Sequence, residues 1–165
     1  MRKIIIAVII VSFTLNSCLK KSGNECVFNA CAFTASSAEI QTVQNYLSTN
    51  SLTATQHCSG MFYRIENPGT GPTPGPCSNV TVTYKTYFFD GTILDQSTTP
   101  VPVNLTQTIM GWRIGMPLLK TGGRIVMYIP PSIAYGNQNV TDANGNIVIP
   151  ANSYLVFEVD LISVS

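Results

Sequence analysis

Charged side chains are scarce in this sequence: Asp, Glu, Lys and Arg together make up 10% of its 165 residues, against about 25% in an average soluble domain. The formal net charge is +1, and the sequence has neither a basic stripe nor an acidic tail. A nucleic acid is therefore not expected as a partner. The apolar fraction of 45% is ordinary, so the chain can bury the core of one domain.

The residues that usually carry enzyme chemistry are also few. His57 is the single histidine and lies in a polar connector, so no Ser-His-Asp set and no Cys–His pair is expected in the β-rich part of the chain. No C-x-x-C pair occurs, which argues against a metal site. Carboxylates such as Glu66, Asp90 and Asp142 are scattered, as is typical of solvated surface groups.

The N-terminus has the features of an export signal. Arg2 and Lys3 precede the unbroken apolar run Ile4–Val11, which is shorter than the ~20 residues that span a bilayer. Residues 1–17 are therefore predicted to be a secretory signal peptide, with a buried N-terminal strand as the alternative. The tetrapeptide LNSC, which ends at Cys18, resembles a bacterial lipobox. This resemblance implies a lipid on Cys18 and attachment to the periplasmic side of the bacterial envelope, with the outer membrane preferred.

Four further cysteines, Cys26, Cys31, Cys58 and Cys77, follow the lipobox. An even number in an exported chain indicates two disulfides, with three possible connectivities. We favour Cys26–Cys31, which closes a short loop, together with Cys58–Cys77, which ties the start of one strand to the start of the next.

Residues 18–59 are predicted to be a lipidated tether that contains one helix near residues 36–50. Ser36 can cap this helix, and Glu39 lies in its first turn. The apolar residues within it recur at helical spacing. We interpret this helix as a docking or spacing element, followed by a polar connector.

The pattern changes to β from Gly60 onward, and residues 60–165 are predicted to form one domain. Asp90-Gly91 is a strong hairpin signal. One short helix is expected in this half, and Pro117 limits its regularity. A long loop is expected over residues 132–149. This order predicts an antiparallel sheet with a short helix, an α+β fold preceded by the N-terminal helix. The expected strands cover 61–66, 80–87, 93–95, 101–105, 124–129 and 154–164, and the helix covers 111–119.

A collinear series of short motifs resembles the FK506-binding family of prolyl isomerases over about residues 60–165, in the form of an exported lipoprotein of Bacteroidetes type. Each motif alone is weak, and periodicity alone would favour an ordinary core, but the ordered set is specific. The motifs are VTVTY (80–84), DGTILD (90–95), IMGWRIG (109–115), GGR (122–124), YIPP (128–131), AYG (134–136), IPAN (149–152) and LVFEV (155–159).

The resemblance implies a strongly twisted sheet wrapped around the short helix, with a proline-binding pocket between them. It also implies the roles of the site residues. Tyr84 is a wall, Asp95 the rim carboxylate, Ile109 a backbone N–H donor, Trp112 the floor, Tyr135 a hydroxyl donor and Phe157 the back of the pocket, while Leu94, Val101, Thr108, Val148 and Ile149 contact the substrate. The expected activity is cis/trans isomerisation of X-Pro bonds in client polypeptides, without a cofactor or metal; FK506-like macrolides are candidate ligands.

The sequence departs from the family pattern at the pocket rim. Leu94 replaces the usual Phe, Thr108 replaces an apolar residue, and the short segment 96–100 lacks the Arg that often accompanies Asp95. We therefore expect an open rim, an unpartnered Asp95 and reduced activity. Two alternatives stay open: a non-catalytic proline-binding chaperone or assembly module, and a structural lipoprotein subunit of an envelope complex.

Overall fold

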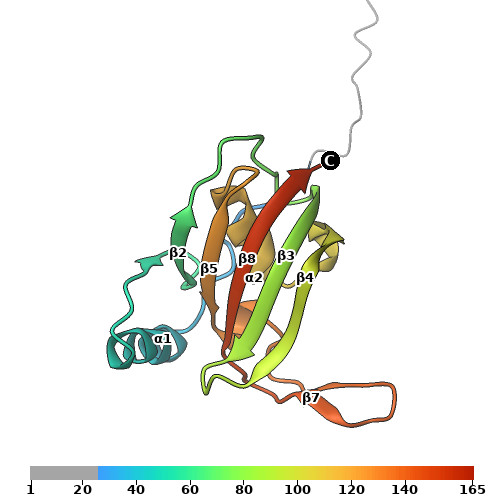
Figure 1. Cartoon of the computed structure of the whole chain (residues 1–165). Helices are drawn as coiled ribbons and strands as arrows, with labels where there is room; N and C mark the ends of the chain where they lie inside the picture. The colour runs from blue at the N-terminus through green and yellow to red at the C-terminus, as the bar shows by residue number, and fades with distance from the viewer. Residues whose placement is uncertain (1–25) are drawn as a thin grey trace, which may run out of the picture.

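A six-stranded antiparallel sheet organises residues 26–165, the part of the chain that the computed structural model describes. The spatial order of its strands is β1-β2-β5-β8-β3-β4 (Figure 1). The expected signal peptide and Cys18 lie outside the described residues. The strands are β1 (Thr55–Gln56), β2 (Phe62–Asn67), β3 (Asn79–Phe88), β4 (Ile93–Asn104), β5 (Arg124–Ile129) and β8 (Leu155–Val164).

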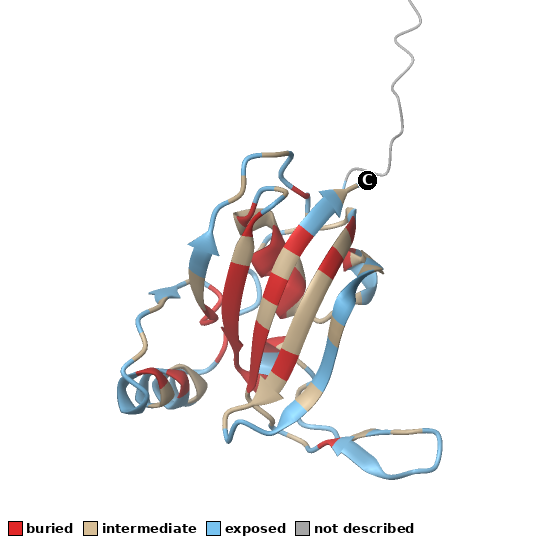
Figure 2. Ribbon diagram, in the orientation of Figure 1, coloured by how far each residue is buried: buried red, intermediate tan, exposed pale blue. Residues whose placement is uncertain are grey.

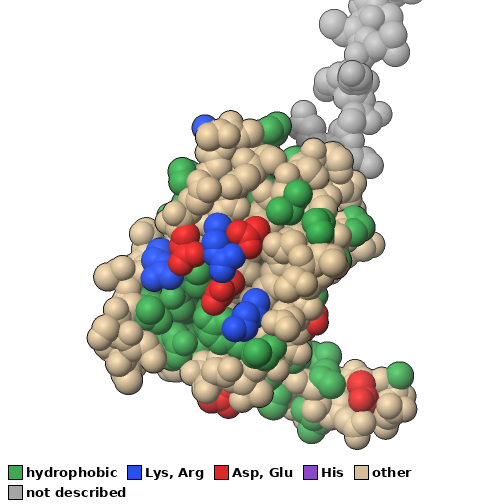
Figure 3. Space-filling view, viewed as in Figure 1, with side chains coloured by type: hydrophobic (Ala, Val, Ile, Leu, Met, Phe, Trp, Pro, Cys, Tyr) green, Lys and Arg blue, Asp and Glu red, His purple; other side chains and the backbone are tan. Residues whose placement is uncertain are grey.

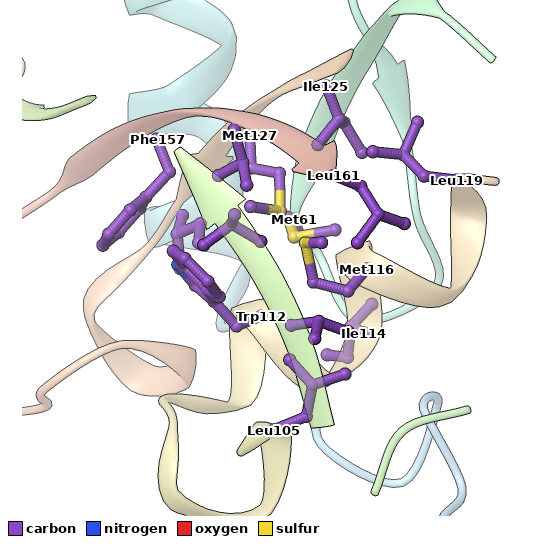
Figure 4. Close-up of a cluster of buried hydrophobic side chains, with 14 of the residues drawn as sticks. Met61, Leu105, Trp112, Ile114, Met116, Leu119, Ile125, Met127, Phe157 and Leu161 are labelled. Atoms are coloured by element: carbon purple, nitrogen blue, oxygen red, sulfur yellow. The ribbon is translucent and has the colours of Figure 1, made fainter. Parts of the chain in front are cut away.

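Helix α2 (Met110–Gly115) packs on one face of this sheet and continues as a 3₁₀ turn, Met116–Leu118. The sequence predicted a single helix over 111–119. Pro117 has no N–H for an α-helical hydrogen bond, and the chain tightens at this point. In Figure 4 the side chains of α2 point toward strand residues such as Met127 and Leu161, with which they form the main core. The predicted α+β class, an antiparallel sheet with a short helix, is confirmed.

Helix α1 (Ser37–Thr49) covers part of the opposite face of the sheet. The Ser36 side chain accepts from the Glu39 N–H and the Glu39 carboxylate accepts from the Ser36 N–H, a capping box that fixes where the helix begins. Its buried residues, Val43 and Leu47, pack against β2, β5 and β8. Within the described residues, no helix is long and apolar enough to cross a membrane.

Strand β5 is buried on both faces because a helix packs on each side of it (Figure 2). Ile125, Met127 and Ile129 belong to the core around α2, whereas Val126 and Tyr128 belong to the cluster around α1. Two-sided burial accounts for a strand whose sequence is apolar at nearly every position.

Strand β4 joins two segments that the sequence predicted as separate strands. Residues 96–100 do not separate them. Gln96 and Ser97 continue the pairing with β3, and a bulge follows, because β4 takes four residue steps from Ser97 to Val101 where β3 takes two from Tyr84 to Val82. Because β4 is an edge strand, its prolines interrupt no inner ladder of hydrogen bonds.

The predicted loop over 132–149 contains a 3₁₀ turn and a projecting hairpin of β6 (Val140–Thr141) and β7 (Ile147–Ile149), seen at the lower right of Figure 1. Its tip is closed by the Asp142 carboxylate, which accepts hydrogen bonds from the N–H groups of Asn144 and Asn146. Short-range side-chain bonds of this kind hold the tip in shape.

The favoured disulfide pairing is wrong: the structure joins Cys26 to Cys77 and Cys31 to Cys58, with Cα–Cα distances of 5.9 and 5.4 Å. The reason is that the segment before α1 packs against the sheet domain. The Ala35 N–H donates to the Ser59 carbonyl, which brings Cys31 toward Cys58.

Arg113 fixes the other end of the same segment. Its guanidinium lies 4.4 Å from the centre of the Phe28 ring and donates to the Pro76 carbonyl. These contacts place Cys26 beside Cys77. The Cys26–Cys77 disulfide thus joins the segment expected to be a tether to the domain, whereas Cys31–Cys58 closes a loop within residues 18–59.

Candidate functional site

A cavity of about 400 Å³ opens between α2, the β3–β4 side of the sheet and strand β7. It contains most of the site residues predicted from the sequence. The lining residues are Tyr84, Thr86, Leu94, Asp95, Val103, Thr108, Trp112, Tyr135, Val148, Ile149 and Phe157.

Trp112 is at the centre of an aromatic cluster in this cavity. Its side chain is 5% exposed. Its ring makes edge contacts with Tyr84, at a centroid distance of 6.0 Å and an interplanar angle of 81°, and with Phe157, at 5.7 Å and 88°. Such perpendicular contacts are the preferred geometry of aromatic pairs and hold the indole in place.

Two close approaches bring the helix that carries Trp112 down onto β5. A Cβ built on Gly111 would lie 2.5 Å from an atom of Ile129, and one built on Gly115 would overlap the sulfur of Met127. Glycine at both positions therefore sets how deeply the indole sits against the sheet.

Asp95 is well partnered, contrary to the expectation from the missing Arg. The Tyr84 hydroxyl donates to Asp95 Oδ2 at 2.6 Å, and the Gln96 N–H donates to Oδ1 at 2.8 Å. The hydrogen bond to Asp95, together with burial, raises the pKa of Tyr84 to about 12. Tyr84 thus keeps its proton across the physiological range and stays a donor to the carboxylate.

Tyr135 lies at the mouth of the cavity and is 42% exposed. Burial of its hydroxyl, followed by the nearby charge of Asp95, raises its pKa. Within residues 26–165 this hydroxyl makes no hydrogen bond. It is therefore a donor that a ligand can engage.

Ile109 does not line the cavity, but its backbone has the conformation of a helix N-cap, with φ −60° and ψ 156°. Its carbonyl accepts from Trp112 and Arg113, while its own N–H finds no acceptor in the described part of the chain. Its role as a donor to substrate stays a prediction.

Val101 is the other predicted residue that the cavity leaves out; Val103, two positions along β4, takes its place. Sequence reasoning also missed Thr86. Each missed residue lies two positions after a predicted one on the same strand, Val103 after Val101 and Thr86 after Tyr84. Because residues two apart on a strand share a face, this alternation could have predicted both.

Metal binding finds no ready site in the part of the chain described. Cys31, His57 and Cys58 are the one group there whose ligand atoms lie within 4.8 Å of one another. The sulfurs of Cys31 and Cys58 are bonded to each other, so neither is a free thiolate.

Comparison with known proteins identifies the domain around the cavity. A sequence profile of the FKBP-type peptidyl-prolyl cis-trans isomerases matches residues 71–162. The chain belongs to this family. The family that the sequence motifs indicated is thereby confirmed.

Two relatives and two solved structures show how far the similarity extends. This chain is 38% identical over 109 residues to the isomerase FkpA of Escherichia coli K12 and also to that of Buchnera aphidicola from Acyrthosiphon pisum. Each match covers 64% of this chain; it covers 38% of the Escherichia coli protein and 43% of the Buchnera protein. A Pseudomonas syringae peptidyl-prolyl isomerase structure matches with a TM-score of 0.66 and 30% identity, over 80% of this chain and 97% of that one. The structure of Escherichia coli FkpA matches with a TM-score of 0.65 and 31% identity, over 78% and 60%. The chain therefore spans about two-fifths of the length of the FkpA relatives.

Proposed function

We propose that this chain is a peptidyl-prolyl cis-trans isomerase that holds X-Pro segments of client polypeptides in the cavity around Trp112. The observation that carries the proposal is the Trp112 ring, which packs against Tyr84 and Phe157 and lines a cavity in the family-matched part of the chain. A proline ring is a compact apolar group that can stack on such an indole face.

The proposed mechanism is differential binding of the twisted peptide bond. Rotation about a peptide bond has a barrier of about 18–20 kcal/mol because resonance stiffens the C–N bond. Resonance is lost in the twisted state, and the amide becomes less polar. An apolar aromatic cavity stabilises this state relative to the planar, hydrated amide.

Two hydrogen-bond donors would hold the client while the bond turns. The Tyr135 hydroxyl and the Ile109 N–H are the two predicted donors, and both lack an acceptor among the described residues. The rotation breaks no covalent bond, so these groups need only orient the flanking carbonyls. The rim carboxylate, Asp95, acts in this scheme through the orientation of Tyr84.

A protease-free assay of cis-to-trans isomerisation on X-Pro peptides tests the proposal. Tyr135→Phe removes one donor hydroxyl, and we expect kcat/KM to fall about tenfold, the cost of one hydrogen bond that strengthens in the transition state. Tyr63→Phe is the matched control, because Tyr63 lies on β2 outside the cavity. Absence of any acceleration by the wild-type chain would reject the proposal.

Peptide binding without acceleration would instead indicate the non-catalytic proline-binding module. One observation favours this second candidate: Leu94, which stands where the family usually has Phe, lines the cavity. A wall with one fewer ring confines the twisted bond less closely. Peptide binding measured in parallel on the wild-type chain separates the two functions.

We further propose that the protein is exported and attached to the bacterial envelope by a lipid on Cys18, with its domain on the periplasmic side. The support is the apolar run that ends at the lipobox-like tetrapeptide. Cys18→Ser should abolish incorporation of labelled fatty acid and release the protein from the membrane fraction. Incorporation that persists in this variant would contradict the assignment.

A further inference from the structure

Thr86 lies in the middle of β3, between the strands that carry two other cavity residues. It is paired with Asp95 of β4 on one side and with Phe157 of β8 on the other. All three residues line the cavity. Thr86 is 3% exposed, and its Oγ1 is buried and has no hydrogen-bond partner within the described residues.

The other buried polar residue of the described chain shows the usual arrangement: the Ser59 hydroxyl lies 3.0 Å from His57 Nδ1. A buried hydroxyl without a partner costs free energy, because its hydration is lost and nothing replaces it. Valine has nearly the same shape and avoids this cost. Thr86 thus destabilises the unoccupied protein at a position that faces the site.

The polar groups that line the cavity beside Thr86 are hydrogen-bonded to other residues and not to its hydroxyl. The Asp95 carboxylate accepts from Tyr84 and Gln96. The Thr108 hydroxyl donates to the Leu105 carbonyl at 2.8 Å. The partner that Thr86 lacks can come from an occupant of the cavity.

We propose that Thr86 is a client-binding residue whose hydroxyl donates a hydrogen bond to a main-chain carbonyl oxygen of the X-Pro segment held in the cavity. Rotation of χ1 from one staggered position to another exchanges Oγ1 with the methyl group, so the hydroxyl can turn toward the occupant. Proline has no N–H, but every X-Pro segment offers carbonyl oxygens, so a donor serves any client. This inference rests on the proposed function, because it assigns a contact to the same cavity.

The test compares Thr86→Val, Thr86→Ser and Thr83→Val in the full-length protein. Thr83 is the matched control: it lies on the same strand outside the cavity, with its hydroxyl 3.4 Å from Asp160. We expect Thr86→Val to lower kcat/KM about three- to tenfold on an Ala-Leu-Pro-Phe peptide. The same variant should raise the thermal midpoint, by about 3 °C. Thr86→Ser should retain the activity, and Thr83→Val should leave it unchanged.

The opposite effects on stability and activity distinguish client binding from a structural role. Unchanged activity in Thr86→Val would overturn the inference, as would equal losses in the Val and Ser variants, which would indicate packing. If the wild type shows no isomerase activity, the proposed function fails, and the affinity for a fluorescent Ala-Leu-Pro-Phe peptide becomes the readout. Equal affinity of wild type and Thr86→Val would then refute the role of the hydroxyl.

Discussion

Replacing both cysteines of the outer disulfide, Cys26→Ser with Cys77→Ser, tests the crosslinks that the structure assigns. The outer bond joins residues 51 apart, and the inner bond, Cys31–Cys58, joins residues 27 apart within that loop. The inner crosslink already shortens the outer loop by about half. Closing the remainder lowers the entropy of the unfolded chain enough to stabilise the fold by about 3.5 kcal/mol.

The assay is equilibrium unfolding in urea of the full-length protein, followed by tryptophan fluorescence, since Trp112 is the single tryptophan. The free energy of unfolding should fall by about 3.5 kcal/mol in the variant that lacks the outer bond. Loss of both bonds removes about 7 kcal/mol, which is comparable to the whole stability of many domains. Full reduction should therefore unfold the protein, or nearly so.

A second pair of substitutions separates the two connectivities. Cys26→Ser with Cys31→Ser breaks both bonds in the structure and leaves Cys58 and Cys77 as free thiols, which a thiol reagent would count. Under the pairing favoured from the sequence, the same variant would lose only one bond and expose no thiol from these four residues. A variant with no such thiol and only a small loss of stability would refute the packing described for the segment before α1.

Three further predictions concern packing, pH and the cavity wall. Gly115→Ala forces a methyl group against the sulfur of Met127 and should lower the free energy of unfolding by about 1–3 kcal/mol, measured by denaturation. A variant as stable as the wild type would contradict the close approach. Burial alone would raise the pKa of Glu66, but hydrogen bonds and charge from Arg124 and Arg64 outweigh this effect and lower the pKa. The ionised carboxylate of Glu66 therefore stabilises the fold at neutral pH, and this contribution is lost as the pH falls through the lowered pKa. Glu66→Gln should therefore flatten the loss of stability in acid, and an unchanged slope would count against the ion pairs. Leu94→Phe should raise kcat/KM several-fold by adding a ring to the cavity wall, and a drop would show that leucine is the fitted residue.

The two faces of the sheet show why the sequence predicted one half of the protein better than the other. In the strand predicted over 154–164, apolar residues recur at every second position from 155 to 161, and all four are buried in the core around α2. The Asp90-Gly91 turn was also predictable, because its residues suit the positive φ of 89° at Gly91. Local periodicity and turn chemistry are sufficient for such elements.

Contacts distant in sequence could not be predicted in the same way. The opposite face of the sheet is covered partly by α1 and partly by an ion cluster around Arg124, which bonds Glu66, Glu158 and Asp160 (Figure 3). Nothing in the spacing of these residues indicates that they meet. The disulfide pairing failed for the same reason, since it depends on where the segment before α1 packs.

Within the cavity, the motifs predicted nine of the eleven lining residues, because collinear motifs fix positions that periodicity alone does not. Val101 was predicted in place of Val103, two positions along β4. The missing Arg suggested an unpartnered Asp95, but the Tyr84 hydroxyl donates a hydrogen bond to its carboxylate. That Tyr84 takes the place of the missing Arg as the partner of Asp95 can be seen only in the folded structure.

The β6–β7 hairpin separates the part of the molecule that can change length from the part that cannot. Its base is held by the Asn152 N–H on the Gly136 carbonyl and by the Ala151 N–H on the Asn139 side chain, at 2.9 and 2.8 Å. Its tip bonds mainly to itself through Asp142. A longer segment, or a whole folded module, can therefore be inserted at the tip while Val148 and Ile149 stay in the cavity wall. The hairpin is thus a site where new client-binding surface can be added beside an unaltered cavity.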